Sequence, residues 1–141
     1  MIKEIIDDVI SELSAISGLS FVELAVAENE EDLEELLKTP KRLPGCYVVY
    51  RGADFTKKRV IGSNAAEHEM EILVLLIAKN LRSQAEGART CYDFIEAIRS
   101  ALIGHSVGNY GSLWPLAEDL IAAGKGLQCY GLIYGMETKT G

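Results

Sequence analysis

The side chains that could support acid–base, nucleophilic or metal chemistry are scattered along the chain. The two histidines, His68 and His105, have no second histidine or cysteine at metal-ligand spacing. Gly104 and Gly108 flank His105 and Ser106, but the segment is neither a Gly-x-Ser-x-Gly elbow nor a Gly-rich phosphate-binding loop. The sequence therefore predicts no metal site, no cofactor and no catalytic serine.

Two further features could in principle carry chemistry. Glu69 and Glu71 lie two residues apart, a spacing that places both carboxylates on one face of a strand and could serve acid–base work. We interpret them as the solvated start of a strand, because no pocket signature surrounds them. Cys91 is a weakly motivated reactive thiolate, since its nearest basic neighbour is Arg89. The absence of motifs favours a structural or binding protein over an enzyme.

Length, composition and charge are those of one small domain over residues 1–141, with 48% hydrophobic and 25% charged residues. A net charge of −7 disfavours binding to nucleic-acid phosphates. The cysteines are far apart in apolar surroundings, which predicts small core residues in a reducing compartment: Cys46, Cys91 and Cys129. The acidic N-terminus does not resemble a signal peptide, and the longest apolar run is too short to cross a membrane. We therefore expect a protein made and kept in the cytoplasm, without a membrane partner.

The elements that position these side chains are organised around residues 69–79. Every residue from Ile72 to Ala78 is apolar. This run is typical of a strand covered on both faces, although periodicity alone leaves a buried helical turn open. A strand buried on both sides lies inside a sheet, with neighbouring strands on either side. The other predicted strands are Phe21–Ala27, Cys46–Tyr50 and Leu127–Met136.

Three helices are predicted to accompany this sheet. Apolar residues recur at steps of three and four between Ile2 and Ile16, which predicts an amphipathic helix ended near Gly18. A short helix is expected over Asp32–Lys38. A second long helix is predicted to start at a capping box formed by Thr90 and Asp93, after a segment over 80–88 that is either loop-like or a loose first turn.

The segment 51–67 and the C-terminal third of the chain leave alternatives open. Residues 51–67 are predicted to form a long hairpin loop, whose basic cluster is either a mobile tip or a docking loop: Lys57, Lys58 and Arg59. Leu116–Ala123 is a helix by propensity, or a strand that pairs through Gly124–Gly126 with the last strand. In that last strand, Gly131 and Gly135 indicate either bulges or close backbone approach.

The loop and turn regions offer few anchors for the core. Residues 103–112 have the composition of a surface turn, and Trp114 beside it is interpreted as a hydrophobic plug.

Two long helices and one short helix do not clearly cover both faces of five strands, so a partner subunit could supply the missing cover. The interface residues that we predict are Leu73, Leu75, Ile77 and Trp114, together with Lys57, Lys58 and Arg59.

The order of these elements resembles that of a known family. A leading amphipathic helix precedes Arg42-Leu-Pro-Gly-Cys-Tyr-Val-Val-Tyr-Arg-Gly52, which is followed by the long apolar strand. The helix Tyr92-Asp-Phe-Ile-Glu-Ala-Ile-Arg-Ser-Ala-Leu-Ile-Gly104 and a closing aromatic strand complete the pattern. Over nearly the whole chain this succession resembles the small tail proteins of Mu-like phages and prophages, which are similar to the tail-terminator or tail-completion proteins of long-tailed phages.

The resemblance implies an α+β fold with a mixed, mostly antiparallel sheet of about five strands, packed with two long helices and one short helix. It implies that 113–121 is a strand, despite its helix propensity. The implied function is that of a structural virion protein without catalytic residues or cofactor. Such a protein is assembled in the host cytoplasm, caps the tail tube and completes the tail before head joining.

The resemblance also implies partners. These are copies of the chain in a ring, taken as a hexamer, the tail tube, the sheath proteins and the head–tail connector, with no specific nucleic-acid binding and no membrane. The alternatives are another head–tail neck or adaptor protein or, further away, a small cytoplasmic enzyme. The enzyme would need a deep apolar cleft near His68, His105 or Cys91.

Overall fold

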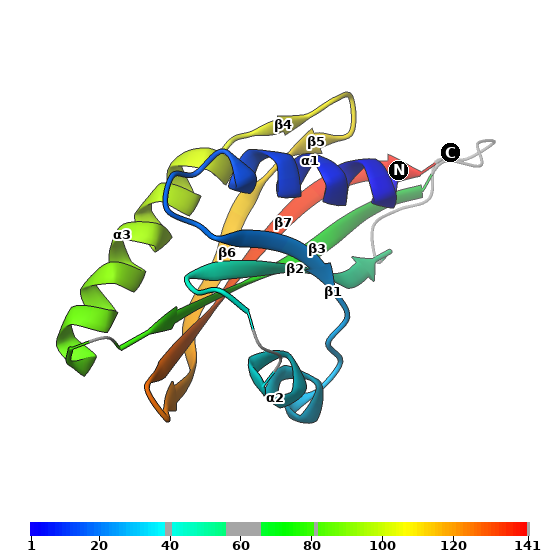
Figure 1. The fold of residues 1–141 in the computed structure, drawn as a ribbon. Helices are drawn as coiled ribbons and strands as arrows, with labels where there is room; N and C mark the ends of the chain where they lie inside the picture. Colours follow the sequence, from blue (N-terminus) through cyan, green and yellow to red (C-terminus); the bar gives the residue numbers. More distant parts are fainter. Residues whose placement is uncertain (39–40, 56–65, 81, 141) are drawn as a thin grey trace.

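The computed structural model describes residues 1–38, 41–55, 66–80 and 82–140, which form an α+β fold (Figure 1). The helices are α1 (Ile2–Ser14), α2 (Glu30–Lys38) and α3 (Gln84–Leu102). The large sheet contains β1 (Phe21–Ala25), β2 (Gly45–Asp54), β3 (Ala66–Lys79), β6 (Trp114–Gly124) and β7 (Leu127–Thr140). A separate small hairpin pairs β4 (Ser106–Val107) with β5 (Gly111–Ser112). Among the helices described, none has the length and apolar character needed to span a membrane.

The strand that the apolar run predicted is the central one. The sheet order is β1-β2-β3-β7-β6, with β1 parallel to β2 and the other neighbours antiparallel. Side chains of β3 alternate between the two faces, as the period of two in a strand requires. The predicted fold class, a mixed and mostly antiparallel five-stranded sheet with three helices, is confirmed.

One face of the sheet, which we call the closed face, lies under α1 and α3. It is defined on β3 by Met70, Ile72, Val74, Leu76 and Ala78, all buried in one cluster with both helices. The helices bury an apolar stripe each: Ile5, Ile6, Val9 and Leu13 from α1, and Cys91, Ile95, Ile98 and Leu102 from α3. Burial of side chains from the sheet and from both helices makes this face the main core.

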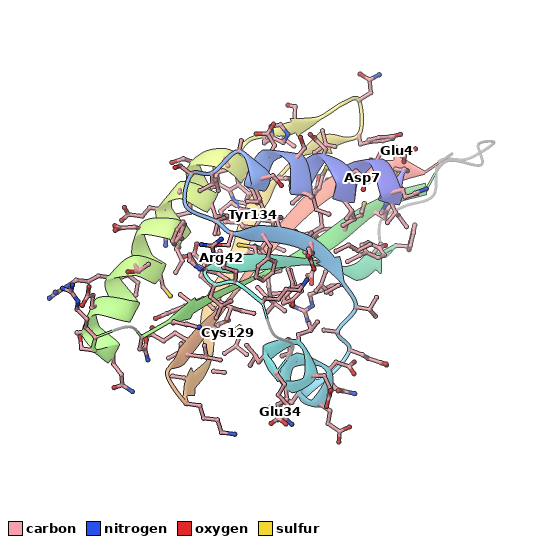
Figure 2. The ribbon with its side chains drawn as sticks, viewed as in Figure 1. Glu4, Asp7, Glu34, Arg42, Cys129 and Tyr134 are labelled. Atoms are coloured by element: carbon pink, nitrogen blue, oxygen red, sulfur yellow. The ribbon has the colours of Figure 1, made fainter. Side chains whose placement is uncertain are left out.

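On the opposite face, which we call the open face, α2 is the one helix among the described residues. It is defined on β3 by Leu73, Leu75 and Ile77, which form a second cluster with Tyr47, Val49 and Cys129. No residue of α2 is buried, although Leu33, Leu36 and Leu37 pack against this cluster. Figure 2 shows Tyr134 on the side of α1 and α3, Cys129 nearer to α2, and Glu34 on the outer side of α2.

The start of α3 differs from the prediction. Ser83 is the N-cap, and its side chain accepts a hydrogen bond from the backbone N–H of Glu86 at 3.1 Å. Thr90 lies inside the helix, where its hydroxyl donates to the backbone carbonyl of Glu86 at 3.1 Å. The predicted capping box at Thr90 and Asp93 was wrong, because Ser83 and Glu86 provide the same three-residue spacing nearly two turns earlier. Of the two alternatives for 80–88, the loop does not hold for 84–88, which are helical.

The hairpin between β2 and β3 is shorter than predicted. A register shift between Tyr50 and Gly52, where Gly52 has φ +127°, lets β2 continue to Asp54, and β3 begins at Ala66. A bulge of this kind accommodates an extra residue without ending the pairing. The predicted basic cluster Lys57, Lys58 and Arg59 lies outside the described residues.

The structure decides between the alternatives for the C-terminal third. β6 is a strand that pairs with β7 through a two-residue turn at Lys125 and Gly126, both with positive φ, which confirms the strand implied by the resemblance. A Cβ atom at Gly131 would lie 2.3 Å from Ile121 Cδ1, and one at Gly135 would lie 2.8 Å from Leu116 Cδ1. Both glycines therefore allow β6 side chains to lie over β7. The bulges are not at these glycines, because the register shifts fall within β6.

Candidate assembly surface

The edge strand β6 exposes a row of large apolar side chains. Their exposed fractions range from 38% to 63% at Trp114, Leu116, Leu120 and Ile121. Single exposed apolar residues are ordinary, but several on one edge strand are of the kind that marks interaction sites. We call these four residues the β6 edge. Leu120 pairs with Tyr130 of the closed face, whereas Leu116 and Ile121 lie over glycines on the open face.

A groove on the open face adjoins the β6 edge. Its apolar lining includes Leu73, Ile121 and Ile133, while Arg51 and Asp119 contribute charge. Gly131 lies in the same groove and lets Ile121 approach β3. Apolar side chains with charges among them are typical of protein–protein contact surfaces. Glu30 and Leu33 of α2 border the groove on its other side.

The opposite edge of the sheet is apolar as well. Leu24 on β1 is 61% exposed, and Val26 just after it is 85% exposed. Lys41 donates a hydrogen bond to the Glu23 carboxylate at 2.8 Å on the same edge. Within the part of the chain that the structure describes, no strand pairs with the outer side of β1 or of β6. The sheet thus offers two different unpaired edges.

The predicted interface residues fall in different environments. Leu73 is half-buried and borders the groove, but Leu75 and Ile77 are buried beneath α2, where a partner subunit could reach them only if α2 moved. Trp114 is 63% exposed, so its interpretation as a plug was wrong. Leu113 occupies the buried position beside it, and strand alternation directs the tryptophan outward.

The edge strand β6 is tied to α3 by an ion pair. Arg99 Nε donates to Glu118 Oε2 at 2.8 Å, and Arg99 Nη2 bonds to Glu118 Oε1. The hydrogen bonds from Arg99 hold the pKa of Glu118 below its ordinary value of 4.5. Burial raises the pKa of Tyr134 to about 12. Its hydroxyl has no hydrogen-bond partner among the described residues. The ion pair between Arg99 and Glu118 holds β6 to α3 on the closed face, while the β6 edge stays exposed.

The cysteines lie in the core, as predicted. All three are buried free thiols, and burial raises the pKa of Cys46 to about 12, of Cys91 to about 11 and of Cys129 to about 12. Because the thiolate is the reactive form, burial and a raised pKa disfavour a reactive Cys91, which the sequence had only weakly motivated.

The glutamate pair and His68 do not form a catalytic arrangement. Glu69 and Glu71 are only partly buried, and Glu71 Oε2 lies 3.9 Å from Arg51 Nη1, which agrees with a solvated strand start. His68 is buried within β3, and its ring centroid lies 4.7 Å from that of Phe55.

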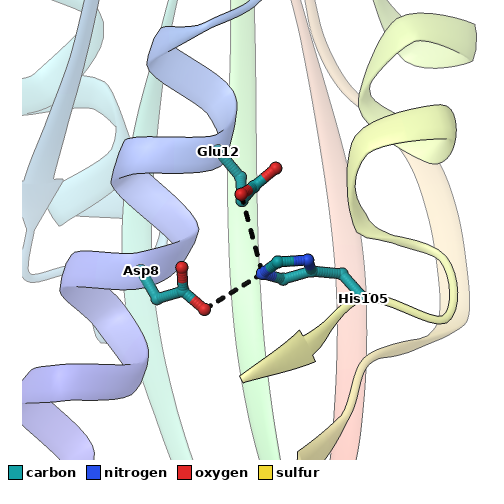
Figure 3. Close-up of side chains that lie close together, drawn as sticks. All are labelled: Asp8, Glu12 and His105. Carbon is teal, nitrogen blue, oxygen red and sulfur yellow. Dashed lines mark hydrogen bonds and ion pairs between the residues drawn. The ribbon is translucent and has the colours of Figure 1, made fainter. Parts of the chain in front are cut away.

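One cluster escaped the sequence analysis. His105 Nε2 lies 3.0 Å from Asp8 Oδ2 and 3.8 Å from Glu12 Oε1 (Figure 3). The four-residue spacing of the two acids on α1 was a signal that they share a helix face. Their proximity to His105, which is 97 residues from Asp8 in the chain, follows only from the tertiary structure.

The fold is an α+β domain whose large sheet exposes apolar side chains at both of its edges. The chain matches the phage tail terminator protein family over residues 6–139, and it belongs to that family. It is therefore a structural component of the virion tail of a phage-like particle and not an enzyme. The enzyme alternative is thereby set aside.

A second similarity concerns the fold of the chain. The chain is similar to a chain in a solved structure described as "Virion of native gene transfer agent (GTA) particle", with 21% sequence identity and a TM-score of 0.58. The alignment covers 94% of this chain and 92% of that one. At this identity the likeness shows a shared fold. No curated protein sequence matches the chain.

Proposed function

We propose that copies of this chain form a closed ring on the last ring of the tail tube and thereby end tube growth before the head joins. The ring is hexameric by the resemblance to Mu-like tail proteins. The observation that supports the proposal is the presence of exposed apolar residues on two different edges of one sheet, at β1 and at β6.

The two edges suit a ring better than a dimer. A contact between two different surfaces generates a ring when the rotation between subunits closes, whereas a two-fold dimer uses the same surface twice. If the β6 edge of one subunit meets the β1 edge of the next, every apolar edge in a closed ring is covered. Edge strands left exposed are prone to uncontrolled association, so closure also solves a solubility problem.

Capping follows from the two unlike ends of such a ring. One end binds the tube by shape and charge complementarity, and the other presents a surface that further tube subunits do not recognise. The net charge of −7 also favours passage of DNA through the ring, since like charges weaken contact with phosphates. The sheath and the head–tail connector are the further partners that we propose.

A double variant tests the ring. Trp114→Ser with Leu116→Ser removes two open-face members of the β6 edge next to its first register shift, which lies between Pro115 and Ala117. The matched control is Ile103→Ser, which replaces a similarly exposed apolar residue just after α3. Native mass is measured by light scattering over a concentration series, and purified tail tubes with added protein are imaged by electron microscopy.

We expect rings of the wild-type protein and of Ile103→Ser, in solution or on tube ends, and neither for the double variant at an unchanged unfolding temperature. A wild-type protein that is monomeric at every concentration and leaves tube ends unoccupied would overturn the ring. That outcome would favour a monomeric neck or adaptor protein of the virion.

A further inference from the structure

We infer that Asp8, Glu12 and His105 form a binding site for a divalent transition-metal cation of the Zn²⁺ class. The site joins α1 to the turn between α3 and β4, and it lies apart from the groove on the open face. The inference is independent of the proposed ring.

The donor atoms already lie at nearly the spacing that one ion requires. One oxygen each from Asp8 and Glu12 and one ring nitrogen of His105 all lie within 4.8 Å of one another. Ligands about 2.1 Å from a zinc ion, at angles of about 90–110°, are about 3.0–3.4 Å apart. The 3.0 Å between His105 Nε2 and Asp8 Oδ2 fits this range, and the 3.8 Å to Glu12 Oε1 needs only a small side-chain adjustment.

The two halves of the site are held by separate parts of the core. Asp8 and Glu12 lie one turn apart on α1, and the apolar stripe of that helix is buried on the closed face. The His105 backbone N–H donates to the Leu102 carbonyl, and its own carbonyl accepts from the N–H of Leu113, both at 3.0 Å. A preformed arrangement of this kind lowers the cost of binding, because few side-chain rotations remain to be frozen.

Electrostatics also favour a bound cation. Among the described residues, no lysine or arginine forms an ion pair with Asp8 or Glu12, and both carboxylates lie near the His105 ring. With a neutral imidazole the cluster carries two negative charges, which one divalent cation balances. The three side chains are partly exposed, at 23–40%, so water can complete the coordination shell.

The donor set selects among cations. An imidazole nitrogen beside two carboxylates suits Zn²⁺, Co²⁺ or Ni²⁺, whereas Mg²⁺ and Ca²⁺ prefer oxygen ligands alone. The arrangement of three protein ligands with a remaining open position is common for zinc. The site is therefore expected to prefer Zn²⁺ over Mg²⁺.

Titration of the full-length protein with Co²⁺ and Zn²⁺ tests the site. Visible absorption reports Co²⁺ coordination, and calorimetry reports the stoichiometry and affinity for Zn²⁺ and, separately, for Mg²⁺. The variants are Asp8→Asn and His105→Gln, which keep side-chain size, and the control is Asp7→Asn, which removes an exposed carboxylate next to the cluster on the same helix.

We expect saturable binding of one Co²⁺ or Zn²⁺ per chain, a higher unfolding temperature with Zn²⁺, and weaker binding of Mg²⁺. Asp8→Asn and His105→Gln should each weaken binding at least about 10-fold, since even partners outside the ligand shell contribute about 10–100-fold. Asp7→Asn should bind as the wild type does.

Two results would overturn the inference. One is the lack of saturable Zn²⁺ or Co²⁺ binding by the wild-type protein, and the other is binding that survives both cluster substitutions. In either case the three side chains form only an ion pair. If a variant does not fold, NMR of the wild-type histidine rings keeps the test decisive: Zn²⁺ must shift the His105 resonances and leave those of buried His68 in place.

Discussion

The two faces of the sheet differ in how completely this chain covers them. On the closed face, α1 and α3 bury the side chains of β3 in a continuous core. On the open face, α2 buries none of its own residues and covers only one end of the sheet, so a groove remains between α2 and the β6 edge. The difference indicates that folding free energy is concentrated on one face, while the other keeps apolar surface available for neighbouring subunits.

Two leucines of β3, three residues apart, show the difference between the two faces. Leu76 points to the closed face and is fully buried, whereas Leu73 points to the open face and is half-buried beside the groove. The same residue type in the same strand therefore has two different environments. This allows matched substitutions to separate the two contributions.

The largest expected effect is on the closed face. Leu76→Ala should lower the free energy of unfolding by about 2–5 kcal/mol, because it leaves a cavity that surrounding side chains cannot fill. Leu73→Ala should cost clearly less, about 1 kcal/mol, since its side chain is already partly in contact with water. Urea denaturation of both variants measures the difference. Equal losses would show that the open face contributes to the core as much as the closed face does.

A second pair of substitutions compares the covered and uncovered ends of the open face. A Cβ atom at Gly45 would lie 2.0 Å from Cε1 of Phe21, a ring that packs on Tyr47 with centroids 5.1 Å apart. Gly45→Ala should therefore cost about 1–3 kcal/mol through overpacking. A Cβ atom at Gly131 would lie 2.3 Å from Cδ1 and 3.1 Å from Cγ1 of Ile121, and 3.4 Å from Cδ1 of Leu73, which is an ordinary contact. Because Ile121 is partly exposed and can rotate toward solvent, Gly131→Ala should cost less than about 1 kcal/mol. Thermal unfolding ranks the two variants; a reversed order would mean that the groove is tightly packed.

The smallest expected effect concerns the anchor of β6 to the closed face. Because the pKa of Glu118 is lowered in the folded protein, its pairing with Arg99 stabilises the fold above the ordinary pKa of 4.5. This contribution is lost as the pH falls through the lowered folded-state value. Arg99 is about half-exposed, so Glu118→Gln should cost at most about 1 kcal/mol at neutral pH.

The measurement is the difference in urea midpoint between wild type and Glu118→Gln across an acid titration. The two proteins should converge in acid, where the wild-type carboxylate is protonated too. A difference that persists unchanged in acid would show that the glutamine variant is destabilised for a reason other than the ion pair.

The sequence predicted the closed face better than the open one. The apolar run Ile72–Ala78 indicates a strand buried on both faces, and the periodicity of α1 indicates a helix buried along one stripe. Both kinds of burial can be predicted from residue types alone. The predicted surface features failed where local signals compete. Thr90 and Asp93 matched a capping pattern that Ser83 and Glu86 use, and Trp114 was interpreted as a plug although Leu113 is the buried neighbour.

The candidate sites were only partly visible in the sequence. Leu73 and Trp114 were predicted as interface residues and lie on accessible surface, but Leu75 and Ile77 were predicted with them because alternation alone does not say that α2 covers one end of the face. The exposed members Leu120 and Ile121 were missed, since the segment that contains them has helix propensity and becomes a strand only through pairing with β7.

By itself, the sequence determined the class of fold, the central strand, the two long helices, the buried cysteines and the family resemblance, because these depend on local periodicity and on the order of elements along the chain. The tertiary structure decided which face α2 covers, which edge strands stay unpaired and that Asp8, Glu12 and His105 meet. These depend on contacts between residues far apart in the chain, which no local pattern of residue types encodes.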